Sequence, residues 1–134
     1  MVFGKESFHW LHYIAGGWNA GSGKYSIMAT DPAKRATFIE STVLHLQEFG
    51  FEGVDLDWEY PGTGLGTDEN TDMASFSALV DEFKTALSPY GLLLTAALSP
   101  GYDKIALAYD VPYIFERFDF ANIMCYDYHG WWPE

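Results

Sequence analysis

The stretch FEGVDLDWEYPG, residues 51–62, carries acidic residues at every second position of an apolar run. These residues are Asp55, Asp57 and Glu59. Val54 precedes Asp55, and Leu56 and Trp58 lie between the acidic residues. Side chains along a strand alternate between its two faces, so residues 52–59 are predicted to form a strand with one acidic and one apolar face. The apolar face would pack against helices, and the acidic face needs a different explanation.

The rest of the chain alternates between strand-like and helix-like segments. Further strands are predicted at residues 10–16, 92–99 and within 121–130. The continuously apolar strand at 92–99 is expected to be buried on both faces. Helices are predicted at residues 32–49, about 72–87 and near 111–117, with a loop between the strand at 92–99 and the last helix. The helix at 72–87 is predicted to have one apolar stripe, made of Phe76, Leu79, Val80, Phe83 and Leu87. The first of these helices has a favoured N-cap in Asp31, followed by Pro32, and a favoured end in Gly50. Residues 19–30 are predicted to be a Gly/Ser-rich loop with at most a helical turn.

This order of elements predicts right-handed βαβ units and a parallel sheet. Helices cover both faces of a doubly wound sheet, where the acidic row would be deeply buried. In a barrel, one face of each strand points to the interior and the C-terminal end of the strand opens onto the active site. The fold class is therefore predicted to be α/β, with one domain over residues 1–134. Glu59 would lie at the mouth, with Asp57 and Asp55 progressively deeper.

Three carboxylates this close together cannot all ionise at low cost, because burial and like charges both raise carboxyl pKa values. One proton is predicted to be shared within the row, and the outermost residue, Glu59, could stay protonated near neutral pH. A protonated carboxyl over a cleft suits general acid catalysis. The spacing alone leaves two alternatives open, a magnesium or calcium site built from these oxygens and an ordinary exposed acidic strand.

The composition narrows the choice of partners. The formal net charge is −12, with only 7 Lys and Arg, which argues against binding to nucleic acid or to an anionic membrane surface. Cys125 is the only cysteine, so no intrachain disulfide is possible, and it is predicted to be a small core residue. No transmembrane stretch is evident, and the first residues are not predicted to be a signal peptide. Four residues belong to no motif and are predicted to be structural: His9, His12, Lys24 and His45.

Four segments together resemble one known family, the glycoside hydrolase family 18 chitinases and chitinase-like proteins. FEGVDLDWEYPG resembles the strand-four signature D-x-x-D-x-D-x-E, and AGGWN at 15–19 resembles strand three. LTAALSPG at 94–101 resembles strand five, and MCYDYHGWW at 124–132 resembles strand six. The four motifs occur in order and cover nearly the whole chain. The WEYP and YDYHG variants are most similar to animal chitinases.

The resemblance implies a partial (β/α)8 TIM barrel with the equivalents of strands 3 to 6, and hydrolysis of β-1,4-linked N-acetylglucosamine by a retaining, substrate-assisted mechanism. It implies that Glu59 is the general acid and base and that Asp57 orients the substrate's acetamido group. Asp55 would hold the shared proton, and Tyr126 would donate its hydroxyl to the acetamido oxygen. The implied partner is chitin or a chitooligosaccharide, without a cofactor or metal ion. The implied location is extracellular.

Further residues are implied to bind the sugar. Trp18 would stack on a sugar ring, and Ala97 and Met124 would line the acetamido pocket. Tyr60 and Asp127 would make polar contacts near the scissile bond. Two alternatives are open for Trp131 and Trp132, which either bind sugar or pack against other residues. His129 is expected to form local hydrogen bonds.

The chain departs from the family pattern in two respects. Glu52 stands where the signature has its first Asp, and a structural role is expected for it. No segment matches strands one, two, seven and eight, so the chain is expected to be a fragment that is poorly stable, aggregates or pairs with another half. The alternatives to a chitinase are a lectin-like protein and an inactive fragment. Glu59, which lectin-like members often replace, favours an enzyme.

Overall fold

The computed structural model describes residues 11–127. Four strands form one sheet: β1 (His12–Gly16), β2 (Gly53–Asp57), β3 (Leu93–Leu98) and β4 (Phe120–Ile123). The α-helices are α1 (Ser22–Thr30), α2 (Pro32–Phe49), α3 (Asp72–Leu87), α4 (Tyr102–Ala108) and α5 (Val111–Phe115). Two short 3-10 helices complete the fold: η1 (Trp18–Ala20) and η2 (Ser88–Tyr90).

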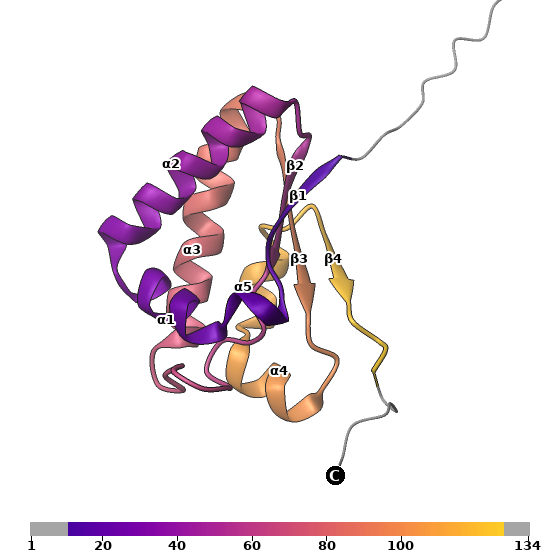
Figure 1. The fold of residues 1–134 in the computed structure, drawn as a ribbon. Helices are drawn as coiled ribbons and strands as arrows, with labels where there is room; N and C mark the ends of the chain where they lie inside the picture. The colour runs from indigo at the N-terminus through magenta and orange to yellow at the C-terminus, as the bar shows by residue number, and fades with distance from the viewer. Residues whose placement is uncertain (1–10, 128–134) are drawn as a thin grey trace, which may run out of the picture.

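The sheet is parallel, and its strands lie side by side in the order β1-β2-β3-β4. Ile14 pairs with Asp55, and Asp55 pairs with Thr95, so these three residues share one face of the sheet. The helices α2 and α3 lie together on the other face (Figure 1). Strands in chain order with helices on one face form a segment of a barrel, whereas a doubly wound sheet reverses its order and carries helices on both faces. The predicted fold class is confirmed.

The core lies between the sheet and these helices. The apolar face of β2 is buried there through Val54 and Leu56, and Trp58 continues it beyond the strand. The predicted apolar stripe of α3 is buried against it, namely Phe76, Leu79, Val80, Phe83 and Leu87. Burial of these side chains supplies the main driving force for folding. The alternation in residues 51–62 therefore predicts correctly which face of β2 the helices cover.

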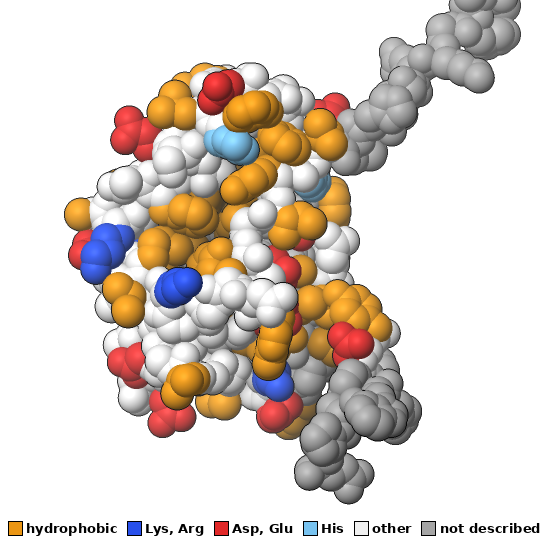
Figure 2. Space-filling model, in the orientation of Figure 1, with side chains coloured by type: hydrophobic (Ala, Val, Ile, Leu, Met, Phe, Trp, Pro, Cys, Tyr) orange, Lys and Arg blue, Asp and Glu red, His pale blue; other side chains and the backbone are white. Residues whose placement is uncertain are grey.

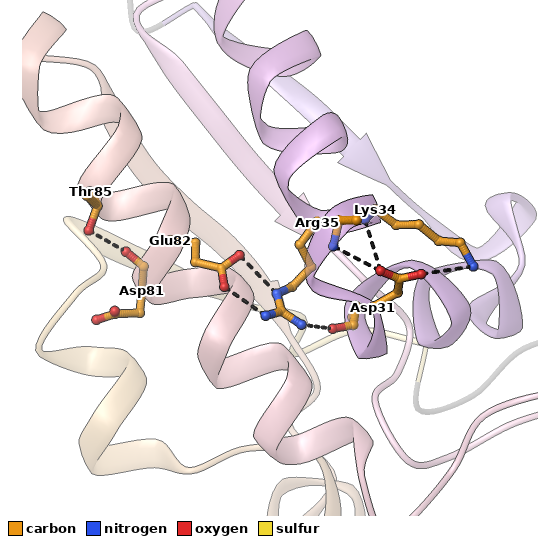
Figure 3. A network of polar contacts seen from close by, with 8 residues as sticks. Asp31, Lys34, Arg35, Asp81, Glu82 and Thr85 are labelled. Atoms are coloured by element: carbon orange, nitrogen blue, oxygen red, sulfur yellow. Dashed lines mark hydrogen bonds and ion pairs between the residues drawn. The ribbon is translucent and has the colours of Figure 1, made fainter.

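The helix α2 begins and ends at the predicted residues. The carboxylate of Asp31 accepts hydrogen bonds from the backbone N–H groups of Ala33, at 2.9 Å, and Lys34, at 3.4 Å. Gly50 closes the helix in a left-handed conformation. Arg35 of α2 reaches across to the carboxylate of Glu82 on α3 (Figure 3). Caps and this cross-link together fix how α2 lies on α3.

The prediction of a loop over residues 19–30 is wrong, because α1 spans nine residues of that segment. Its apolar stripe is short: Ala29 is buried, and Tyr25 and Met28 are partly buried against the core. The stability of α1 comes mainly from packing on α2 and α3. The segment after the third strand was also predicted to be a loop, and it contains α4.

The prediction that the third strand is buried on both faces is wrong for the described part of the chain. Helices cover only one face of β3, and Leu93 and Ala97 on the other face are partly exposed. On the same open face, the side chain of Ile14 is 63% exposed. Beside β1, hydrophobic side chains of α1 and α2 also reach the surface (Figure 2), around a cleft of about 270 Å³ that includes Phe38.

Candidate active site

The predicted site residues gather at the carboxyl ends of the strands. Asp57 is the last residue of β2, and Glu59 follows two residues later. Trp18 comes just after β1, and Met124 and Tyr126 come just after β4. In a parallel sheet with barrel topology, this is the edge at which active sites form. The topology thus brings together residues that are more than 100 positions apart in sequence.

Asp55 is the deepest carboxylate of the row and the most firmly held. Its side chain is buried, and its Oδ1 accepts a hydrogen bond from the Thr95 hydroxyl and another, at 3.3 Å, from the Asn122 amide. The Thr95 hydroxyl also lies 3.3 Å from Nδ1 of His12. The polar network therefore runs across all four strands on the open face of the sheet.

Sequence reasoning missed three members of this network, Thr95, Asn122 and His12. His12 was predicted to be structural without a link to the site. One signal was available: Thr95 is a polar residue in the middle of the apolar run LLLTAAL, residues 92–98. A buried polar side chain needs a partner, so its presence indicates a polar group on the neighbouring strand.

Asp57 has an environment that favours its neutral form. Burial raises its pKa from the ordinary 3.8 to about 6, and the charges of Glu59 and Asp55 add to the effect. Its buried Oδ1 has no hydrogen-bond partner within the described part of the chain. The sequence predicted that the row shares one proton and that Glu59 could stay protonated, and the resemblance gave the shared proton to Asp55. The structure raises the pKa of the middle residue, Asp57, chiefly through burial and further through the acid on either side.

The Gly-Gly pair after β1 allows the chain to lie directly against Asp57. The N–H of Gly17 donates a hydrogen bond of 2.7 Å to the Asp57 carbonyl oxygen. A Cβ on Gly16 would lie 2.6 Å from the Asp57 carbonyl carbon and closer still to its oxygen. Gly16 also has a φ of 135°, which side chains disfavour. Only glycine therefore permits this close approach of the ends of β1 and β2.

Glu59 and Tyr60 lie beyond the end of β2. Burial raises the pKa of Tyr60 to about 12, together with a hydrogen bond to Glu59 and the nearby negative charges. The ammonium group of Lys104 lies 5.3 Å from the centroid of the Tyr60 ring. Trp58 points to the opposite side and is buried among the helices, as the alternation predicts.

A cleft of about 470 Å³ opens beside Glu59. Trp18 forms part of its wall, and the side chain of Trp18 is 74% exposed. On the other side lies Leu65, which is 98% exposed. An exposed aromatic ring and an exposed aliphatic side chain beside a carboxylate provide apolar surfaces for a ligand with flat apolar faces.

The remaining predicted residues lie on or near the segment after β4. Met124 is buried, whereas Tyr126 and Asp127 are exposed, and Asp127 has a φ of 57°. Desolvation raises the pKa of Tyr126, and the charges of Asp57 and Glu59 raise it further, which places its hydroxyl within reach of their field. Ala97 is partly exposed on the open face of β3. The other residues for which the sequence stated an expectation, His9, His129, Trp131 and Trp132, lie outside the described residues.

Two further expectations have clear outcomes. Glu52 has a structural role, because its carboxylate accepts a hydrogen bond of 3.0 Å from the backbone N–H of Leu11, just before β1. The prediction that Cys125 is a core residue is wrong, since it is a free and exposed cysteine. Cys125 follows an edge strand, where no further element of the described chain packs over it.

Between residues 11 and 127, no group of three or more His, Cys, Asp or Glu side chains is arranged to hold a metal ion. The search of the same residues for a membrane-spanning helix finds none that is sufficiently long and apolar.

Comparison with known proteins gives consistent matches. The family model described as "Glycosyl hydrolases family 18" matches residues 11–134. "Probable chitinase 10" of Drosophila melanogaster is 40% identical over 125 residues, which cover 89% of this chain and 5% of that protein. "Probable endochitinase" of Caenorhabditis elegans is 39% identical over 124 residues, which cover 87% of this chain and 19% of that protein.

Solved structures agree with these matches. The Group IV chitinase of Ostrinia furnacalis matches with a TM-score of 0.87 and 38% identity, over 91% of this chain and 33% of that chain. The same chitinase has also been solved in complex with allosamidin. The present chain therefore spans no more than about a third of the proteins compared here.

Proposed function

Because the chain belongs to family 18 of the glycosyl hydrolases, we propose that it supplies the catalytic carboxylates for hydrolysis of β-1,4-linked N-acetylglucosamine in chitin. The observation that carries the proposal is the row Asp55, Asp57 and Glu59 on the open face of β2. The row ends beside a cleft that contains the exposed ring of Trp18. In this proposal, residues 1–134 are part of a catalytic domain that acts outside the cell.

Glu59 is the general acid in the proposed mechanism. It transfers its proton to the glycosidic oxygen as the bond from that oxygen to the sugar's anomeric carbon breaks. The carbonyl oxygen of the substrate's own N-acetyl group forms a new bond to that carbon, which gives an oxazolinium ion. Glu59 then takes a proton from water, which attacks the same carbon and restores the acetamido group. Two displacements at one carbon give net retention of configuration.

Asp57 orients the acetamido group. Its buried Oδ1 lacks a partner within the described residues, so it can accept a hydrogen bond from the acetamido N–H without breaking another contact. Its negative charge would stabilise the positive charge that develops on the oxazolinium ring. Asp55, held by Thr95 and Asn122, stays behind it and can share a proton with it.

The other predicted residues shape the sugar site in this proposal. Tyr126 donates its hydroxyl to the acetamido oxygen, and it is protonated near neutral pH because its pKa lies above the ordinary 10.0. Trp18 stacks on a sugar ring in the cleft. A third group provides contacts around the scissile bond and the acetamido pocket: Tyr60, Ala97, Met124 and Asp127.

The test is hydrolysis of N-acetylated chitotetraose by the 134-residue chain, beside the variant Glu59→Gln and the control Glu69→Gln. Glu69 is an exposed acid in the loop that follows, so its substitution makes the same chemical change away from the row. We expect turnover in the parent and the control, and at least about a 100-fold loss in Glu59→Gln. Equal turnover in all three would refute the role of Glu59.

A parent chain without turnover is then tested for binding of chitotetraose by calorimetry. Binding without turnover would replace the enzyme proposal with a lectin-like function. Absence of both from a folded, monodisperse sample would contradict the proposed function of this chain.

A further inference from the structure

The segment that carries Glu59 is attached to α1 by side chains for which the catalytic proposal has no role. The Ser22 hydroxyl donates a hydrogen bond of 3.0 Å to the carbonyl oxygen of Tyr60. The same hydroxyl accepts one of 2.8 Å from the indole N–H of Trp58. Ser22 thus contacts the residue before Glu59 and the residue after it. Movement of Glu59 relative to α1 would break one or both bonds.

A second attachment lies one helical turn further along α1. Asp72, at the start of α3, is fully buried, with 0% of its surface exposed. One of its oxygens accepts a hydrogen bond of 2.7 Å from Ser26. The other accepts bonds from the backbone N–H groups of Gly62, at 3.1 Å, and Asp68, at 3.0 Å. This carboxylate therefore joins α1 to both ends of the loop that follows Glu59.

Between these two attachments the backbones of α1 and the loop touch. A Cβ on Gly23 would lie 3.1 Å from the Cα of Gly66, and a Cβ on Gly66 would lie 3.2 Å from the Cα of Gly23. Both glycines line the cleft beside Glu59, as do Ser22 and Leu65. The width of the cleft is therefore set by how closely α1 and the loop approach each other.

Ser26 differs from an ordinary helical serine, and Ser22 is the first residue of α1. A serine inside a helix commonly bonds back to the carbonyl group one turn earlier, as Ser77 does to Met73 at 3.0 Å in α3. Ser22 and Ser26 are four residues apart, so they lie on one face of α1, and both of their hydroxyls bond to groups outside the helix. The face of α1 that they occupy is the face turned toward the loop.

We propose that Ser22, Ser26 and Asp72 are positioning residues that hold the segment 58–68 against α1. In this way they fix the place of Glu59 and the width of the cleft beside it. The effect of this attachment on catalysis and on sugar binding rests on the proposed function. The attachment itself can be measured without any substrate.

The first test is amide hydrogen exchange by NMR on the parent chain, Ser26→Ala and Ser77→Ala. Loss of the Ser26 bond leaves the buried Asp72 carboxylate with one donor fewer, so its hold on the loop weakens. We expect exchange at Gly62 and Asp68 to become about tenfold faster in Ser26→Ala, the change typical of a lost bond to a charged group. Exchange within β2 should stay unchanged, and Ser77→Ala should match the parent. Unchanged exchange at Gly62 and Asp68 in Ser26→Ala would overturn the proposal.

Ser22→Ala provides a second, independent variant with its own spectroscopic signature. The indole N–H resonance of Trp58 should move and its exchange should quicken, because its acceptor is gone. Asp72 keeps all its partners in this variant, so Gly62 and Asp68 should remain protected. A Trp58 indole resonance that is identical in Ser22→Ala and the parent would contradict the role of Ser22.

Kinetics on chitotetraose then separate positioning from simple loss of folded protein. Partial unfolding lowers the apparent kcat and leaves KM unchanged. We expect Ser26→Ala to raise KM several-fold because the cleft wall loosens. We expect Ser22→Ala to lower kcat because Glu59 is displaced, and to do so even after kcat is corrected for the folded fraction measured by urea unfolding. If Ser26→Ala had the same KM as Ser77→Ala, the role of Ser26 in setting the cleft width would be contradicted. If the parent has no activity, the proposed function fails, and the exchange data still decide the attachment.

Discussion

At the scale of single residues, the carboxylate row shows how position sets chemistry. Asp55 lies deepest and is held by donors from β3 and β4, whereas Asp57 is flanked by two acids and has a raised pKa of about 6. The three residues have similar side chains and are spaced by two. In the proposed mechanism, their different surroundings, rather than their types, assign them different tasks.

The raised pKa of Asp57 predicts a pH dependence of stability. Between the ordinary value of 3.8 and about 6, the folded chain binds more protons than the unfolded chain. The free energy of unfolding therefore falls as pH rises through this window, and the loss is complete above about pH 6. Asp57→Asn cannot ionise, so it should be about 1 kcal/mol more stable than the parent at pH 7.5, after allowance for solvent screening.

Urea unfolding at pH 3 and pH 7.5 checks this prediction. The gain should nearly disappear at pH 3, below the ordinary pKa of 3.8, where Asp57 is largely neutral in both states. Glu48→Gln, an exposed acid on α2, serves as the control and should leave the curve close to that of the parent. A gain in Asp57→Asn that is equal at both pH values would show that ionisation is not its cause.

Gly16 predicts a large backbone effect at the site. In Gly16→Ala the new Cβ would meet the Asp57 carbonyl group, and the residue would have to keep a φ of 135°. The expected cost is about 3 kcal/mol or more in the free energy of unfolding. Gly50→Ala is the control, because Gly50 has a φ of 71° but no atom within 4 Å of a Cβ. It should cost only about 1 kcal/mol. Similar costs in both would mean that the close approach is unimportant.

At the scale of elements, the pairing of α2 with α3 depends on one cross-link as well as on apolar packing. Arg35 donates two hydrogen bonds to Glu82, at 2.9 and 2.8 Å, and a third, at 2.6 Å, to the carbonyl oxygen of Ala29 (Figure 3). The planar guanidinium group suits this fork, which an ammonium group cannot reproduce. The side chain of Lys34, the preceding residue, makes only an exposed contact with Asp31, at 3.6 Å.

These geometries predict different costs for neighbouring substitutions. Arg35→Ala should lower the free energy of unfolding by about 2 kcal/mol, because Glu82 and the Ala29 carbonyl group lose their partner. Arg35→Lys should also lower the free energy of unfolding by a large part of this amount, because lysine cannot form the two parallel hydrogen bonds to Glu82. Lys34→Ala should change it by no more than about 0.5 kcal/mol. Thermal unfolding of the three variants is the measurement, and a Lys34→Ala cost equal to that of Arg35→Ala would refute the argument.

At the scale of the whole molecule, the sheet is covered on one face and open on the other. In the described part of the chain, β1 and β4 are edge strands, and the open face carries exposed Ile14 and Phe120 beside the carboxylates. Unpaired edges and exposed apolar groups are the features through which sheets associate. Such a surface suits a segment of a barrel, where neighbouring units would cover it.

The 134-residue chain should therefore self-associate in solution. Ile14→Lys, which places a charge on the open face at an edge, should shift the distribution toward monomer in sedimentation experiments. Leu44→Lys is the matched control, because Leu44 is 60% exposed on α2 and Ile14 is 63% exposed on β1. A monomeric parent at tens of micromolar, or an equal effect of both variants, would contradict this prediction.

The sequence by itself determined the family, the parallel βα order and the helices α2 and α3. Those features rest on local signals, namely the period-two row of 51–62, the cap at Asp31 and the apolar stripe of α3, which neighbouring residues are sufficient to express. The structure confirms each of them, and the comparisons confirm the family.

Only the tertiary structure decided the rest. The helix α1 has only a short apolar stripe, and the hydroxyls of Ser22 and Ser26 find partners 36 to 46 residues away, so the local pattern was too weak to predict it. The raised pKa of Asp57, the network of Thr95, Asn122 and His12 with Asp55, and the exposure of Cys125 also depend on which strands are neighbours. Burial and contact between distant segments are properties of packing, and packing is settled only when the strands have taken their places in the sheet.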